Sequence, residues 1–140
     1  MSGKGYLILD HPADLGIEAY GESLAQAFQQ AAVALMSIIL DLATVGKSES
    51  RNVRISADDP GQLLVKWLGE VLYLYDGQGF AGREFSISTI GTTYLEATIY
   101  GEMYRPGKHK VKMDVKAVTY HQLEVGESEK GARVRVFLDV

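Results

Sequence analysis

The last two residues of the chain, Asp139 and Val140, bring several hard oxygen donors together: a side-chain carboxylate, a carbonyl and the terminal carboxylate. Calcium, magnesium and manganese ions take such ligands. Alternate residues of a strand point to opposite faces, so the apolar residues at 134, 136 and 138 would face the core while Asp139 faces away from it. A third carboxylate from elsewhere would complete a cation site. On composition alone, a solvated chain end explains the same residues.

Other kinds of chemistry find little support among the side chains. The sequence has no cysteine, which excludes disulfides, thiolate catalysis and zinc sites built on sulfur. His11, His109 and His121 are too far apart in the sequence for an H-E-x-x-H zinc motif, and a capping or internally hydrogen-bonded role is the simpler interpretation of each. No serine lies in a G-x-S-x-G nucleophile motif. Any metal site must therefore use oxygen or histidine.

Two glycine-containing segments imitate phosphate-binding motifs. Gly77, Gly79 and Gly82 have the G-x-G-x-x-G spacing, but they follow an expected helix and precede an expected strand, the reverse of a dinucleotide site. A flexible helix-to-strand loop fits them better. Residues 46–48 resemble the end of a P-loop, yet Asp41 stands where that motif needs glycine, and its carboxylate would repel phosphate. Neither segment predicts a nucleotide site.

Charge argues against unaided nucleic-acid binding. The formal net charge is −4 at pH 7, so attraction to a polyphosphate does not dominate this protein. Basic residues nevertheless gather in one stretch, at Arg105, Lys108, Lys110, Lys112 and Lys116. A solvated loop and strand edge explains this stretch, and an RNA or protein contact is the sharper alternative.

Two helices are expected to support these residues. Ser23 and Gln26 form a capping box, and apolar residues then recur at three- or four-residue steps as far as residue 39. Asp59 and Pro60 begin a second helix with a cap and a proline at its first position, and Asp76-Gly77 marks its expected end. Each helix would bury one apolar stripe.

The remaining periodic segments alternate between apolar and polar residues, as strands do when one face lies on the core. They are residues 6–9, 17–21, 53–57, 85–89, 95–101, 115–120, 122–125 and 134–138. Short turns between them favour antiparallel pairing. We therefore predict an α+β fold, with two helices packed on one side of a largely antiparallel sheet, as a single domain over residues 1–140. Neither a signal peptide nor a membrane span of about 18 apolar residues is evident, so a cytoplasmic location is expected.

Several short segments also follow one another in a recognisable order. They are H-P-A-D at 11–14, A-Y-G at 19–21, W-L-G-E-V-L-Y-L at 67–74, G-E at 101–102, K-A-V-T-Y-H at 116–121 and V-F-L-D-V at 136–140. Together they resemble the archease family, and the resemblance runs from residue 6 to residue 140. Two departures are mild: Gly69 stands where asparagine is common, and Val140 stands where isoleucine is more frequent.

The resemblance implies a protein cofactor without turnover of its own. Archeases assist the GTP-dependent RNA ligase of tRNA splicing and RNA repair, and are thought to promote its guanylylation and multiple turnover. Asp14, Asp139 and Val140 would be the metal ligands, for calcium or for magnesium or manganese, and Lys116 would contact the ligase. Nucleic acid would be met only indirectly. Two alternatives remain: a chaperone of RNA-modifying enzymes such as a tRNA methyltransferase, and a small metal-dependent hydrolase.

Overall fold

The computed structural model describes residues 3–10 and 14–140. The elements follow one another as β1 (Gly5–Asp10), β2 (Asp14–Gly21), α1 (Leu24–Ile39), a 3-10 turn η1 (Leu42–Thr44), β3 (Glu49–Ser56), α2 (Pro60–Gln78), β4 (Phe80–Ile90), β5 (Tyr94–Met103), β6 (Ala117–Ser128) and β7 (Gly131–Asp139). Within these described ranges, no helix is long and apolar enough to cross a membrane.

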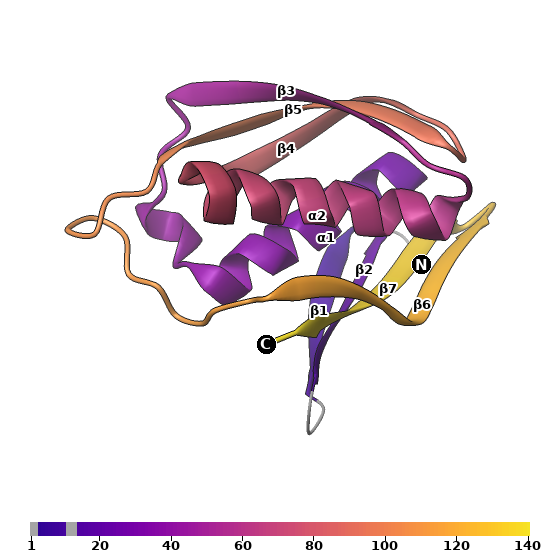
Figure 1. The fold of residues 1–140 in the computed structure, drawn as a ribbon. Helices are drawn as coiled ribbons and strands as arrows, with labels where there is room; N and C mark the ends of the chain where they lie inside the picture. Colours follow the sequence, from indigo (N-terminus) through magenta and orange to yellow (C-terminus); the bar gives the residue numbers. More distant parts are fainter. Residues whose placement is uncertain (1–2, 11–13) are drawn as a thin grey trace.

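The strands form two antiparallel sheets with the helices between them (Figure 1). One sheet has the order β1-β2-β7-β6, and the other has the order β3-β5-β4. Helix α1 contacts β2, β7 and β4, while α2 contacts β6, β4 and β3. The predicted α+β class, with two helices against antiparallel strands, is confirmed. The strands form two sheets rather than one, and each sheet covers one side of the layer of helices.

The helix starts occur where the caps predict them. The Ser23 hydroxyl accepts a hydrogen bond from the Gln26 N–H at 3.2 Å, and the Gln26 side chain accepts one from the Glu22 N–H at 3.0 Å. Asp59 caps α2 in the same way. Helix α2 continues past the expected stop and ends at Gln78, because the left-handed backbone conformation that ends it belongs to Gly79, with φ 72°.

The core lies between the sheets and is centred on the helices. Trp67 is fully buried, donates its indole N–H to the Phe28 carbonyl at 2.9 Å, and meets Phe85 edge to face at 6.1 Å. A buried indole that finds an acceptor and an aromatic neighbour contributes both area and orientation. This contact joins α1, α2 and β4.

The four-stranded sheet has one face on this core and one face turned outward. Val134, Val136 and Leu138 of β7 are completely buried on the inner face, opposite Ala19, Ile17 and Leu15 of β2 respectively. Period-two geometry sends the intervening residues of both strands to the outer face. The outward direction predicted for Asp139 follows from this register.

Gly69 lies inside α2, and an added Cβ there would meet no atom within 4 Å. We therefore expect Gly69→Ala to raise the free energy of unfolding by about 1 kcal/mol, because interior helical glycine is costly. Urea denaturation measures this value. Gly101→Ala is the matched control and should destabilise the protein, since its Cβ would collide with the Ala81 carbonyl. Unchanged or lower stability in Gly69→Ala would contradict the prediction.

Candidate functional site

Asp14 and Asp139 lie directly opposite each other at one end of the four-stranded sheet. They are register partners in the antiparallel pairing of β2 with β7, so their side chains leave the same, outer face. Both residues close their strands at this end of the sheet, Asp14 as the first residue of β2 and Asp139 as the last of β7. The fold thus brings together two residues from opposite ends of the chain.

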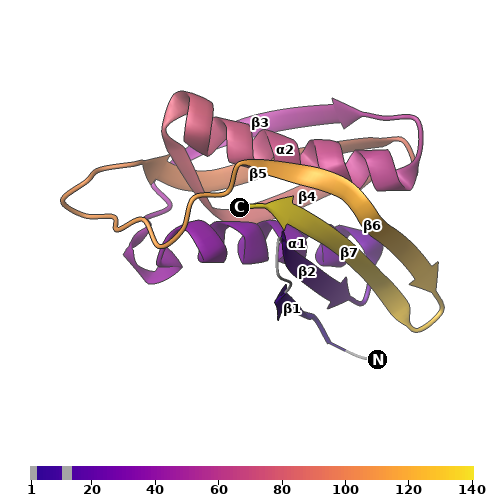
Figure 2. The ribbon, with the colours of Figure 1, turned by 60° about the horizontal axis from the view of Figure 1, so that its bottom comes forward.

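Lys116 and Val140 join the same end of the sheet. Ala117, the first residue of β6, is paired with Asp139, and the Lys116 N–H donates a hydrogen bond to the Asp139 carbonyl at 2.8 Å. Figure 2 shows the chain end beyond β7, next to the segment that enters β6. Val140 follows Asp139 and is 38% exposed. Asp14, Asp139, Val140 and Lys116, the residues expected to bind a metal ion or the ligase, therefore all lie at this end of the sheet.

Carboxylates at two places on the outer face differ in whether they have an ion-pair partner. Farther along β2 and β7, Glu18 is register partner of Arg135, whose guanidinium lies 3.3 Å from Glu18 and 3.1 Å from Glu124 of β6. At the end of the sheet, Asp14 and Asp139 form no ion pair with any other residue that the structure describes. Like charges directly opposite each other destabilise a strand pair. A bound cation would relieve this repulsion.

The donor set here suits a hard cation. Among residues 3–10 and 14–140, no three His, Cys, Asp or Glu side chains gather closely enough to hold a metal ion. With the described residues alone, a site at this end of the sheet would combine the two aspartates with main-chain oxygens such as those of Val140. Oxygen-only ligation fits calcium, magnesium and manganese. His11, from the first segment of the family resemblance, lies outside the described residues.

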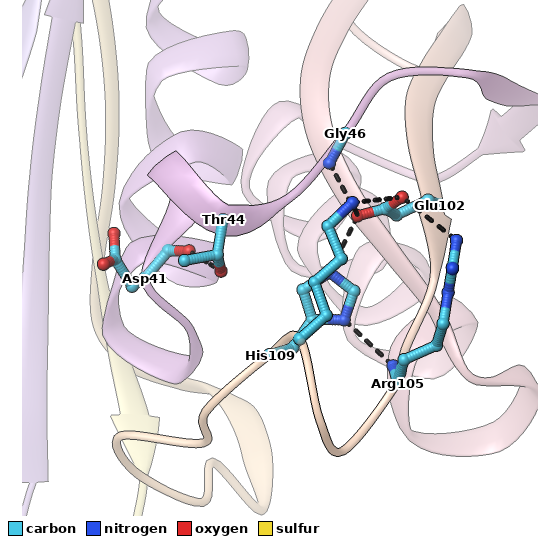
Figure 3. Close-up of polar contacts among 7 residues, drawn as sticks. Asp41, Thr44, Gly46, Glu102, Arg105 and His109 are labelled. Atoms are coloured by element: carbon cyan, nitrogen blue, oxygen red, sulfur yellow. Dashed lines mark hydrogen bonds and ion pairs between the residues drawn. The ribbon is translucent and has the colours of Figure 1, made fainter.

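A second polar cluster, around Glu102, was not predicted from the sequence. Glu102, on β5, is 3% exposed and accepts hydrogen bonds from the Lys108 ammonium, from the Gly46 N–H at 2.8 Å and from His109 at 2.8 Å (Figure 3). The Arg105 guanidinium lies 3.5 Å away. The hydrogen bond from Lys108, followed by those from Gly46 and His109, lowers the pKa of Glu102 from 4.5 to about 2. A carboxylate with these partners is a structural anchor.

His109 is fixed in one tautomer by this cluster. Its Nδ1 accepts a hydrogen bond from the Arg105 N–H at 2.9 Å, so the proton lies on Nε2, which faces Glu102 at 2.8 Å. The ring is 1% exposed. The interpretation of His109 as an internally hydrogen-bonded residue is therefore confirmed.

The basic stretch between β5 and β6 is attached to the body of the protein at several points. Lys108 is bound to Glu102, while Lys112 donates its main-chain N–H to the Ile39 carbonyl at 2.7 Å and its ammonium to the Ser37 carbonyl at 2.8 Å. A lysine at the C-terminal end of α1 also complements the helix dipole. Lys108 and Lys112 nevertheless remain exposed, so the solvated loop expected from the sequence is confirmed, and two of its charges also bind acceptors on the body of the protein. Lys110 and Lys116 are exposed.

Comparison with known proteins identifies the family. The model of the Archease protein family (MTH1598/TM1083) matches residues 6–140, and the chain belongs to this family. Protein archease of Methanosarcina acetivorans is 35% identical over 142 residues, covering 99% of this chain and 97% of the relative. Protein archease of Pyrococcus abyssi is 38% identical over 125 residues, covering 87% and 88%. The resemblance found in the sequence is confirmed.

Solved structures share the fold. The solution structure of protein 1598 of Methanobacterium thermoautotrophicum superposes with a TM-score of 0.79 at 32% identity, covering 97% of this chain and 99% of that one. A crystal structure of an archease from Thermotoga maritima, named there a possible chaperone, superposes with a TM-score of 0.61 at 17% identity, covering 94% of each chain. The second likeness concerns the fold alone.

The lowered pKa of Glu102 predicts a pH-dependent stability. The pKa of Glu102 is lower in the folded state than in the unfolded state. The ionised side chain therefore adds to the free energy of unfolding above about pH 4.5, and this contribution is lost as the pH falls from 4.5 toward 2. We expect Glu102→Gln to be less stable than wild type at neutral pH, with the difference shrinking through this window. Urea denaturation at a series of pH values measures it, with exposed Glu129→Gln as the matched control. A difference that stays constant from pH 5 to pH 2 would contradict the assignment.

Proposed function

We propose that this protein is a non-enzymatic activator of a GTP-dependent RNA ligase in tRNA splicing and RNA repair, and that it promotes guanylylation and multiple turnover of the ligase. The observation that carries the proposal is the pairing of Asp14 with Asp139, two carboxylates opposed at a sheet end without a cationic partner among the described residues. Membership of the archease family supports the choice of partner.

In this proposal the sheet end works as a cation site. Asp14 and Asp139 provide carboxylate oxygens, and Val140 provides main-chain oxygens. A bound calcium, magnesium or manganese ion supplies positive charge, which stabilises the negative charge that develops at a transferring phosphoryl group. Asp14 and Asp139 bind the ion at the end of the four-stranded sheet, where a partner can reach it. Lys116, exposed beside Asp139, contacts the ligase, and RNA is bound by the ligase.

A second candidate is a chaperone of RNA-modifying enzymes such as a tRNA methyltransferase, in which the cation only stabilises the fold. The description of the Thermotoga maritima relative as a possible chaperone favours it. The two candidates differ in one requirement. For the chaperone, a chelator lowers thermal stability, yet any activation of the ligase is independent of metal.

Single-turnover guanylylation of the ligase tests the leading proposal. Asp14→Ala and Asp139→Ala should each lower the rate of activated guanylylation at least tenfold, because each removes one of two opposed ligands. Asp58→Ala is the matched control, since Asp58 is an exposed carboxylate before α2. Wild-type activation by both site variants would remove the aspartates from the mechanism.

The opposed carboxylates also predict a change in stability. In chelator, Asp139→Asn should be more stable than wild type by about 0.2–1 kcal/mol, because the substitution removes a like-charge pair across β2 and β7. Added calcium or manganese should raise the melting temperature of wild type and leave that of Asp139→Asn nearly unchanged. Thermal melts in chelator and in metal measure both effects. An equal response of the two proteins to metal would place the cation elsewhere.

A further inference from the structure

Phe137 is a large apolar residue on the outward face of the four-stranded sheet, yet it is only 2% exposed. Its neighbours along β7, Val136 and Leu138, face the core, and Phe137 is not part of that core cluster. An outward-facing phenylalanine is buried only when other outward-facing groups cover it. Phe137 lies two residues before Asp139 on the same face of β7, so the groups that cover Phe137 lie next to the proposed cation site.

Strand β2 provides the floor beneath the ring. Phe137 is register partner of Gly16, which lies two residues from Asp14 on the same face. A Cβ at Gly16 would lie 2.8 Å from Cε1 of Phe137 and 3.0 Å from Cβ of Leu9 on β1. Real Cβ atoms do not approach so closely, so only glycine allows the ring to rest on β2 in this position. An aromatic ring over a cross-strand glycine pins strand register.

Strand β6 provides the cover above the ring, through an irregularity. Four residues, 120–123, lie between Thr119 and Glu124, while only Val136 separates their partners Phe137 and Arg135. Gln122 in this bulge has φ 49°, a left-handed conformation that is uncommon for a residue other than glycine. Bulges re-aim side chains and are frequent beside functional sites. His121 lies in this bulge, and its ring contacts Phe137.

The bulge is attached to Phe137 by side chain and backbone. The His121 ring meets the Phe137 ring at a centroid distance of 5.9 Å and an angle of 67°. The Thr119 hydroxyl donates to the Phe137 carbonyl at 3.0 Å and accepts a hydrogen bond from the His121 N–H at 3.2 Å. Residues of β2, β6 and β7 therefore meet at the Phe137 ring. On this face, the Gly16–Phe137 pair is the next register pair after Asp14–Asp139.

We propose that Phe137, Gly16 and His121 are positioning residues of the Asp14–Asp139 cation site. This inference rests on the proposed function, because it assumes that the two aspartates bind a cation. The ring on Gly16 fixes β2 against β7 one row from the carboxylates, and thereby fixes the separation of the two ligands.

Calcium and manganese titrations of the full chain by calorimetry test this inference without the ligase. Gly16→Ala should weaken cation binding about tenfold or more, the usual effect of disturbing groups that orient metal ligands. Gly126→Ala is the matched control, because Gly126 lies on the same sheet and a Cβ there would meet only the Arg133 carbonyl, at 4.0 Å. The control should bind like wild type, and circular dichroism confirms that each variant is folded.

His121 provides an independent variant with little risk to folding, because its side chain is exposed. His121→Ala should weaken cation binding severalfold by uncovering Phe137. His121→Phe should restore it, since an aromatic ring again covers Phe137 but cannot ligate a metal. Restoration separates a positioning role from a ligand role.

The outcomes are distinct. Wild-type affinity in both Gly16→Ala and His121→Ala would overturn the inference while leaving the proposed function intact. Failure of His121→Phe to restore binding would overturn the positioning role of His121. A wild-type protein that binds neither calcium nor manganese would overturn the proposed function and, with it, this inference.

Discussion

The antiparallel pairing of β2 with β7 determines where both the core residues of these strands and the two aspartates lie. Its register sets Ile17 against Val136 on the core side, and the same register sets Asp14 against Asp139 on the outer side. A shift by one residue would turn both sets to the wrong faces. Burial of the inner residues therefore stabilises the placement of two carboxylates that repel each other. Hydrophobic packing offsets the electrostatic cost and keeps the two carboxylates opposite each other.

Much of this arrangement could be predicted from local patterns. The caps at Ser23 and Asp59 act within one helical turn, and the alternation in β7 sends Asp139 outward whatever its neighbour is. The partner strand could not be predicted in that way, because alternation assigns a face but not a neighbour. Asp14 was found only through the family resemblance, and the structure explains its place by register.

The sequence did not predict the burial of residues whose partners lie far away along the chain. Glu102 is a charged residue in a strand, and nothing near it in the sequence shows that Gly46 and His109 will enclose it. Phe137 has the period of an outward residue, yet it is buried, with its ring on Gly16 of β2 and beside His121 of β6. Glu102 anchors the start of the segment that leads to Lys116, and Phe137 supports the row beside Asp139.

We propose that Asp14 and Asp139 bind one divalent cation together. A crystal structure of the protein grown with manganese tests it most directly, because the anomalous signal locates the ion without assumptions about coordination. We expect one strong anomalous peak at the end of β2 and β7, within about 2.0–2.6 Å of a carboxylate oxygen from each aspartate. Fully ordered aspartates without such a peak, or with the ion bound elsewhere, would contradict it.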